Sequence, residues 1–211
     1  MTLLYLARHG ETDDNARLVF QGQTGKGLNA RGRAQARRLA ERMHKSRVTS
    51  IFTSDLERAV ETSLIVGAAC GVEPGMDPDL REVDVGLWSG KSHQEIRELY
   101  PEEWAAWSDG LDLRRGGGET YAELAARIER AVARICATDA RDPVLVVSHG
   151  GAIKSYVSKI LGVSAEGMRA LAGVGNAGLT IIERDDRGRM RLHAWNDTAH
   201  LEGLLAIEQT D

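Results

Sequence analysis

Two histidines follow two short apolar segments, and a glycine comes directly after each histidine. Residues 3–7 precede Arg8 and His9, and residues 144–147 lie shortly before His149. A neutral imidazole can attack phosphorus in line and form a phosphohistidine. A neighbouring guanidinium supplies a fixed set of N–H donors to the phosphoryl oxygens. These residue types predict a site that binds and transfers a phosphoryl group.

The apolar segments before both histidines are short and bounded by polar or glycine residues, which is typical of buried strands. Open α/β sheets bind their ligands at the carboxyl ends of the strands. If the two strands are parallel neighbours, His9 and His149 converge at one edge. The backbone N–H groups of Gly150 and Gly151 would open the next helix, and a helix N-terminus favours anions.

Two further residues could complete this chemistry. Arg58 lies near the start of a predicted helix that follows a strand at 49–53, so its guanidinium can point toward the same edge. Glu82 lies in an irregular segment, and its carboxylic acid could protonate the leaving oxygen and later accept a proton from water. Asp84 is the rival acid, and a solvated surface role is the alternative for Arg58 and both carboxylates.

Other site chemistries fit this sequence less well. Ser148 does not stand in a Gly-x-Ser-x-Gly turn, which disfavours acyl transfer. The histidines lack the His-Glu-x-x-His spacing of zinc sites, and no Gly-x-x-x-x-Gly-Lys-Ser/Thr element is present. We therefore expect no metal site and no cofactor.

The composition is that of an ordinary globular protein. The 211 residues are 42% hydrophobic and 27% charged, with a formal net charge of -4. An acidic balance argues against nucleic acid as the partner but allows a small phosphorylated metabolite held by local arginines. We see neither a signal peptide nor an apolar run of about 20 residues, so we expect no membrane contact and a cytoplasmic location. Cys70 and Cys136 are predicted to be buried free thiols, with a structural disulfide as the alternative.

Strands and helices alternate along the chain, which predicts an α/β fold with helical layers on both faces of a mostly parallel sheet. We expect one domain over residues 1–211, with a helical insertion at about 88–118 over the active site. The predicted strands are 3–7, 49–53, 144–147, 179–183 and 190–195. The predicted helices run from Asn29 to about Lys45, from Ser54 or Asp55 to about Cys70, and over 92–99, 102–107, 120–137 and 152–161.

Three finer predictions concern the remaining segments. Residues 73–89 are expected to be irregular, because prolines and glycines interrupt them. Asp142 and Pro143 are expected to turn the chain into the strand at 144–147, and the tail after Thr198 to be loosely ordered. Residues 174–176 and the hairpin at 179–195 are candidates for the contacts of a homodimer.

Six motifs follow one another across nearly the whole chain. The most specific is Leu-Ala-Arg-His-Gly-Glu-Thr-Asp-Asp-Asn at 6–15. The others are Gly-Arg-Ala-Gln-Ala at 32–36, Ser-Asp-Leu-Glu-Arg-Ala at 54–59, Leu-Arg-Glu at 80–82 with Gly-Leu-Trp-Ser-Gly at 86–90, Gly-Gly-Glu-Thr at 117–120 and Ser-His-Gly-Gly at 148–151. In this order the six motifs resemble the histidine phosphatase superfamily, in its phosphoglycerate-mutase-like branch. The resemblance implies a phosphoglycerate-mutase-like three-layer α/β/α sandwich.

The resemblance also implies roles for individual residues. It implies that His9 accepts the phosphoryl group and that Glu82 is the proton donor and later the base. It implies that Arg8, Arg58 and His149 bind the transferring group, with Asn15 as a further phosphate contact. Gln21 and Gly22 match the family pattern and are candidate ligand contacts. In the same loop, Gln23, Gly25 and Gly27 replace the Trp, Asp and Pro that many relatives carry.

We interpret the chain as a metal-independent hydrolase of small phosphomonoesters, such as sugar phosphates or phosphoglycerate-type compounds. Two alternatives stay open: a cofactor-dependent phosphoglycerate mutase, and a module that binds a phosphorylated ligand without turnover. The segment 88–118 is short, which favours an open pocket that water can enter. Arg114 and Arg115 lie in this segment and could bind a second phosphate or a carboxylate, although a surface location is the alternative.

Overall fold

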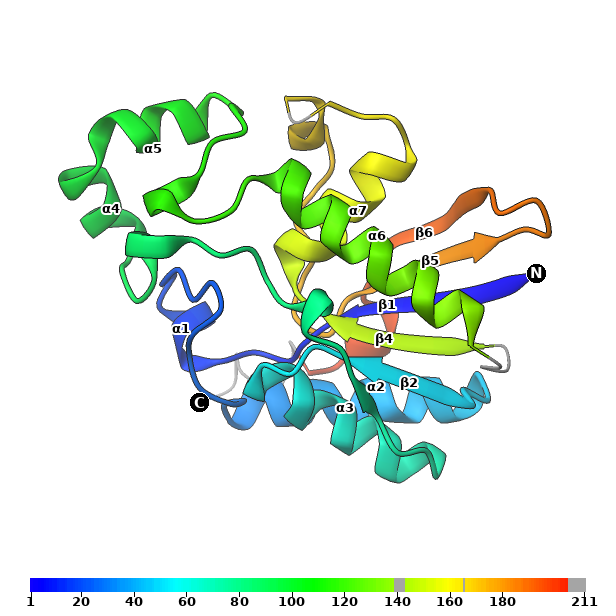
Figure 1. Ribbon diagram of the computed structural model, residues 1–211. Helices are drawn as coiled ribbons and strands as arrows, with labels where there is room; N and C mark the ends of the chain where they lie inside the picture. The colour runs from blue at the N-terminus through cyan, green and yellow to red at the C-terminus, as the bar shows by residue number, and fades with distance from the viewer. Residues whose placement is uncertain (139–142, 165, 205–211) are drawn as a thin grey trace.

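The computed structural model of the protein describes residues 1–138, 143–164 and 166–204. A six-stranded sheet runs through its centre in the order β3-β2-β4-β1-β5-β6 (Figure 1). Strands β1 to β4 pair in parallel, and β5 and β6 add an antiparallel edge beside β1. The strands are β1 (Thr2–Arg8), β2 (Ser50–Thr53), β3 (Gly75–Met76), β4 (Val144–Ser148), β5 (Leu179–Arg184) and β6 (Met190–Asp197).

Helices cover both faces of this sheet, which confirms the predicted three-layer α/β/α architecture (Figure 1). One face packs against α2 (Ala30–Lys45) and α3 (Glu57–Cys70), and the other packs against α6 (Tyr121–Ala137) and α7 (Gly150–Ile160). The short α-helices are α1 (Asp13–Ala16), α4 (His93–Leu99) and α5 (Pro101–Ser108). The 3-10 turns are η1 (Pro78–Leu80), η2 (Gly86–Trp88), η3 (Arg115–Gly117), η4 (Gly167–Ala170) and η5 (Ala199–Leu201).

The central strand β4 is apolar from Val144 to Val147, because both of its faces are buried. In β4, Val144 and Val146 pack toward α6 and α7, whereas Leu145 and Val147 pack toward α2 and α3. Successive side chains of a strand point to opposite faces, so a strand between two helical layers needs a continuous apolar run rather than an alternating one. This burial fixes the register of β4 and therefore the position of the residues that follow it.

Local signals set most helix ends as the sequence predicted. The side chain of Asn29 accepts the N–H of Gly32 and begins α2, and Gly71 ends α3 in the left-handed conformation with φ of +69°. Thr120 and Glu123 form a reciprocal capping box at the start of α6.

The predicted cap of α3 is wrong, because α3 begins after Leu56 without a side-chain cap. Ser54 and Asp55 are engaged elsewhere. The hydroxyl of Ser54 contacts His149, and the carboxylate of Asp55 makes two bonds, of 2.6 and 2.5 Å, to the guanidinium of Arg81. Tertiary partners therefore override the local preference of these residues for the cap position.

Three other details differ from the sequence prediction. Cys70 and Cys136 are only partly buried, because they lie at the last turns of α3 and α6, and neither forms a disulfide. The irregular segment 73–89 contains the short edge strand β3. The tail continues into η5, where Leu201 is 8% exposed and packs with the core of α2 and α3. The turn predicted at Asp142 and the residues after 204 lie outside the described ranges.

The insertion predicted at 88–118 contains α4, α5 and η3. These elements lie beyond the end of the sheet at which β1 and β4 terminate (Figure 1). Among the residues that the structure describes, no helix combines the length and apolar character that crossing a membrane requires.

Candidate active site

The ends of β1 and β4 bring His9 and His149 together. The two strands are parallel neighbours in which Arg8 pairs with Ser148, and the N–H of His9 donates to the carbonyl of Ser148 over 3.0 Å. The two imidazole centroids are 5.1 Å apart, with their planes at 59°. The predicted convergence of the two rings is therefore a direct consequence of strand register.

The hydrogen bonds of His9 define its protonation state. Its Nδ1 lies 2.7 Å from the carbonyl oxygen of Gly10, which can only accept, so Nδ1 carries the proton. The Nε–H of Arg58 donates to Nε2 over 3.2 Å, so Nε2 holds a lone pair. Burial of the ring, followed by the charges of Arg58 and Arg8, holds the pKa of His9 well below its ordinary value. The ring is neutral and its Nε2 is nucleophilic.

Arg58 is 2% exposed, although it lies on the first turn of α3. Its Nη1 and Nη2 donate to the carbonyls of Thr24 and Gly22 over 2.6 and 2.7 Å. Burial lowers the pKa of Arg58 to about 10, which still leaves the guanidinium charged at neutral pH. Arg58 therefore links the nucleophile to the loop that follows α1.

That loop contains Gln21 and Gly22, both buried. Gly22 has φ of +54°, and a Cβ on it would come within 2.7 Å of Cγ2 of Val85. Only glycine avoids both the left-handed strain and this contact. The Oε1 of Gln21 is buried and has no hydrogen-bond partner in the described part of the chain.

Further donors lie around His9. Nη1 of Arg8 donates to the carbonyl of Val174 over 2.7 Å, while its Nε is buried and meets no acceptor among the described residues. Asn176 donates from Nδ2 to the carbonyl of His9 and to Oδ1 of Asn15 over 3.2 and 3.1 Å. The backbone N–H and hydroxyl of Thr12 also donate to Oδ1 of Asn15, which leaves the Nδ2 of Asn15 to donate to a ligand.

His149 is fully buried behind His9, and its Nε2 lies 2.9 Å from the hydroxyl oxygen of Ser54. Ser54 already accepts the N–H of Leu56, so its O–H can donate to Nε2 and leave the ring proton on Nδ1. Nδ1 has no partner in the described ranges. Burial first, then the charge of Arg58, holds the pKa of His149 well below its ordinary value.

Glu82 is docked on the first turn of α7. Its Oε2 accepts the N–H of Gly151 over 3.0 Å, and its Oε1 accepts the N–H groups of Ala152 and Val83 over 3.0 and 2.9 Å. The group that these N–H donors hold at the helix N-terminus is thus a carboxyl group of the chain itself. The rival acid Asp84 is exposed and accepts the N–H of Gly86 over 2.8 Å.

Arg127 holds the backbone of the Glu82 segment, a role that the sequence did not indicate. Its guanidinium donates to the carbonyls of Asp79, Arg81 and Glu82 over 2.8, 3.0 and 3.1 Å. The same guanidinium pairs with Glu119 at 2.7 Å. One arginine on an amphipathic helix gives no spacing signal, so only the fold identifies this function.

These side chains open onto one cavity of about 360 Å³. Its lining includes seven of the predicted site residues: Arg8, His9, Asn15, Gln21, Gly22, Arg58 and Glu82. His149 and Gly150 are not part of this lining; the ring of His149 lies beside that of His9, with its Nδ1 unpartnered among the described residues. The lining also includes Gly151, whose N–H donates to Glu82, and residues to which the sequence gave no role at this site: Leu18, Val19, Phe20, Val83, Val85, His93, Tyr121 and Asn176.

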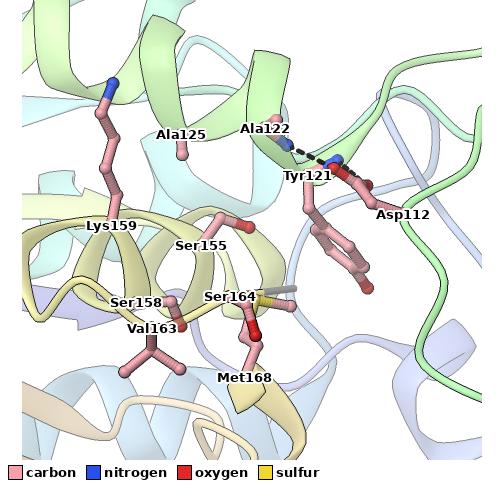
Figure 2. Close-up of a pocket in the computed structure, with 10 residues that line it drawn as sticks. All are labelled: Asp112, Tyr121, Ala122, Ala125, Ser155, Ser158, Lys159, Val163, Ser164 and Met168. Carbon is pink, nitrogen blue, oxygen red and sulfur yellow. Dashed lines mark hydrogen bonds between the residues drawn. The ribbon is translucent and has the colours of Figure 1, made fainter. Parts of the chain in front are cut away.

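A second cavity, of about 300 Å³, lies between α6, α7 and the segment around Met168 (Figure 2). It is lined by Ser155, Ser158 and Lys159 of α7 and contains none of the predicted site residues. Asp112 closes one end of it by accepting the backbone N–H groups of Tyr121 and Ala122 over 2.6 and 3.0 Å (Figure 2). Over the described ranges, we find no group of three His, Cys, Asp or Glu side chains that could hold a metal ion.

A family model described as the histidine phosphatase superfamily (branch 1) matches residues 4–198. The chain is 34% identical over 204 residues to phosphoglycerate mutase-like protein 4 of Arabidopsis thaliana, covering 94% of this chain and 86% of that protein. It is also 34% identical over 213 residues to the metal-independent phosphoserine phosphatase of the same plant, covering 99% of this chain and 87% of that protein.

Among solved structures, the mycobacterial glucosyl-3-phosphoglycerate phosphatase in complex with VO3 superposes with a TM-score of 0.85. The sequences are 34% identical, and the match covers 93% of this chain and 99% of that one. The sequence similarity and the structural superposition therefore both extend over nearly the full length of the two chains.

Proposed function

Because the chain belongs to the histidine phosphatase superfamily (branch 1), we propose that it is a metal-independent phosphatase that hydrolyses small phosphomonoesters through a phosphohistidine on His9. The observation that carries this proposal is the state of His9: a neutral ring whose Nε2 lone pair faces a cavity that contains Arg8 and Arg58. The phosphatase names of relatives that align along nearly the whole chain support the hydrolase over the mutase.

In the proposed first step, Nε2 of His9 attacks phosphorus in line as the bond from phosphorus to the ester oxygen breaks. Glu82 donates a proton to the departing oxygen, which leaves as an alcohol. Arg8, Arg58 and His149 stabilise the charge on the three equatorial oxygens, with Asn15 as a further donor. Without substrate, the Nε–H of Arg58 donates a hydrogen bond to Nε2 of His9. When the substrate binds, this N–H donates to a phosphoryl oxygen instead, and the Nε2 lone pair becomes available.

In the second step, water attacks the phosphohistidine and the bond between phosphorus and Nε2 breaks. Glu82, now a carboxylate, accepts the proton of this water. The products are inorganic phosphate and the free neutral ring of His9. Gln21 and Gly22 line the same cavity and are proposed contacts of the substrate, with Gly150 supporting Arg8 from behind.

We propose that the chain forms a single domain. Within this domain, residues 88–118 are an insertion that forms one wall of the site. His93 and Trp107 of this insertion line the cavity. We further propose a cytoplasmic location, and a homodimer as the assembly to test. Light scattering at micromolar protein concentration measures the mass, and a monomer at all concentrations would remove the dimer.

Turnover of p-nitrophenyl phosphate, with and without a chelator, tests the main proposal. We expect hydrolysis that resists the chelator and is lost in His9→Ala, together with a labelled histidine after brief exposure to a ³²P substrate. Binding without turnover would instead identify a non-catalytic module. Interconversion of 2- and 3-phosphoglycerate that depends on bisphosphoglycerate would identify a mutase.

A further inference from the structure

Ser54 lies at the end of β2, beside the histidine that follows β4. The two strands are parallel neighbours in which Thr53 pairs with Val147. The N–H of Ser54 donates to the carbonyl of Val147 over 3.0 Å, which extends this register past the last residue of β2. Ser54 is 0% exposed, and no step of the proposed phosphoryl transfer uses its hydroxyl.

The backbone on both sides of Ser54 is anchored, so the hydroxyl has a fixed position. The carboxylate of the next residue, Asp55, accepts two bonds of 2.6 and 2.5 Å from the guanidinium of Arg81. The N–H of Leu56 donates to the Oγ of Ser54 over 3.2 Å. The oxygen of Ser54 therefore already accepts one hydrogen bond, and its own proton remains to be donated.

The natural acceptor of that proton is the imidazole of His149, whose Nε2 lies 2.9 Å from the Oγ of Ser54. With the ring proton on Nδ1, Ser54 donates to Nε2, and only the Nδ1–H lacks a partner among the described residues. With the ring proton on Nε2, both the Ser54 hydroxyl proton and the Nδ1 lone pair lack partners in those ranges. Unpaired buried polar groups cost free energy, so the structure favours the proton on Nδ1.

The charge state of His149 makes the position of this proton important. Burial first, then the charge of Arg58, holds the pKa of His149 well below its ordinary value, so the ring is neutral at neutral pH. A neutral imidazole has one N–H donor and one lone pair, and the hydrogen bond at one nitrogen decides which form the other nitrogen takes.

Nδ1 is the nitrogen of His149 that remains for a ligand. It is buried without a partner in the described part of the chain, and its ring centroid lies 5.1 Å from that of His9. An N–H at this position binds a phosphoryl oxygen, whereas a lone pair repels one. Arg8 and Arg58 differ in this respect, because a guanidinium has only donors and needs no partner to select them.

Building on the proposed phosphatase function, we propose that Ser54 is a positioning residue that keeps the ring proton of His149 on Nδ1. The neutral ring then donates its Nδ1–H to an oxygen of the phosphoryl group in both steps of the reaction. Ser54 keeps its hydroxyl proton and His149 keeps its ring proton throughout, so neither residue exchanges a proton with the substrate.

Nitrogen NMR of protein with ¹⁵N-labelled histidine tests the wild-type prediction directly. At neutral pH we expect a protonated Nδ1 and an unprotonated Nε2 for His149, and the spectrum of His149→Gln identifies these signals by their loss. A wild-type ring with its proton on Nε2, or with protons on both nitrogens, would overturn the proposal. This measurement requires no turnover, so its result does not depend on the phosphatase proposal.

The variant Ser54→Ala removes the donor with little change in volume. We expect the form with the proton on Nε2 to gain population in its spectrum. We expect kcat/KM for p-nitrophenyl phosphate to fall by about 10- to 100-fold, the effect of losing one hydrogen bond to a charged group. Affinity for orthovanadate should fall by a similar factor.

Ser63→Ala is the matched control, since Ser63 is also 0% exposed but its hydroxyl donates to the carbonyl of Val60 within α3. It should change neither the ring proton of His149 nor the activity. A loss of activity in Ser54→Ala with the proton still on Nδ1 would make Ser54 a structural residue only. A moved proton with unchanged activity would equally overturn the proposal.

Ser54→Thr retains the hydroxyl, so it should keep the proton on Nδ1 and most of the wild-type activity. If the wild-type protein hydrolyses no phosphomonoester, the phosphatase proposal fails. Calorimetry of inorganic phosphate binding to wild type, Ser54→Ala and Ser54→Thr then tests the Nδ1–H donor by itself. We expect weaker binding in Ser54→Ala alone, and equal affinities in all three proteins would overturn the proposal.

Discussion

The Nε–H of Arg58 donates to Nε2 of His9 over 3.2 Å, so a cation already faces the lone pair of the proposed nucleophile. The other two nitrogens of Arg58 hold the carbonyls of Gly22 and Thr24. Arg58 therefore fixes the ring of His9 and positions the loop at one side of the cavity, and in the proposed mechanism it also supplies charge to the phosphoryl group. These combined contacts explain why an arginine on the first turn of a helix is almost fully buried.

Arg58→Lys should lower kcat/KM for p-nitrophenyl phosphate by about 100-fold or more, because an ammonium cannot make the three directed bonds of this guanidinium. Steady-state kinetics measures the loss. Arg33→Lys is the control, since Arg33 is an exposed arginine that pairs with Glu61 outside the cavity. A loss of less than about threefold in Arg58→Lys would remove Arg58 from phosphoryl binding.

Glu82→Gln should slow substrates with poor leaving groups most, because these substrates depend most on protonation of the departing oxygen. An alkyl phosphate should lose at least about tenfold more activity than p-nitrophenyl phosphate. Asp84→Asn tests the rival acid and should leave the dependence on leaving group unchanged, since Asp84 is exposed and is not part of the cavity lining. Equal losses for good and poor leaving groups in Glu82→Gln would exclude it as the acid.

Gly22→Ala should both destabilise the protein and reduce its activity. The residue has φ of +54°, and the new Cβ would meet Val85 at 2.7 Å. Left-handed strain and overpacking together should cost about 2–4 kcal/mol of unfolding free energy. Gly71→Ala carries the same kind of strain, with φ of +69°, but its Cβ meets no atom within 4 Å. Urea titration should give about 1–2 kcal/mol for Gly71→Ala, with full activity.

The stability of the protein should fall as the pH is lowered below about 6.5. Burial holds the pKa values of His9 and His149 well below their ordinary value, so below pH 6.5 the unfolded chain binds protons that the native state does not. Unfolding free energy then decreases toward acid, with a slope that approaches about 2.7 kcal/mol per pH unit for two such rings.

The variant His149→Gln isolates one of these rings. It should flatten the acid slope by up to about 1.4 kcal/mol per pH unit, which urea titrations between pH 7 and 5 can measure. His44→Gln, on the exposed surface of α2, is the matched control. An unchanged slope in His149→Gln would mean that the buried ring already takes up a proton in the folded protein.

The amino-acid sequence determined the strands and helices that position the site. Uninterrupted apolar runs predicted that β1 and β4 are buried on both faces, and the position of His9 and His149 directly after them predicted that the rings meet. The periodicity of the residues in α2 and α6 predicted their core-facing sides, and Gly71 marked the end of α3. These signals are local, since strand burial, helical spacing and backbone conformation depend on residues that are neighbours in the chain.

Tertiary structure decided the properties that depend on distant partners. From the sequence, Arg114 and Arg115 were equal candidates for binding a second anion. In the structure Arg114 is exposed and forms an ion pair, whereas Arg115 is buried at the cavity and its Nε and Nη2 have no partner among the described residues. The sequence predicted Ser54 or Asp55 as the N-terminal cap of α3, yet Ser54 contacts His149 and Asp55 contacts Arg81. It gave no role to Arg127 and considered Asn176 only as a candidate contact of a homodimer. A side chain's chemistry is set by its burial and by the groups that face it, and those groups come from elements far apart in the chain.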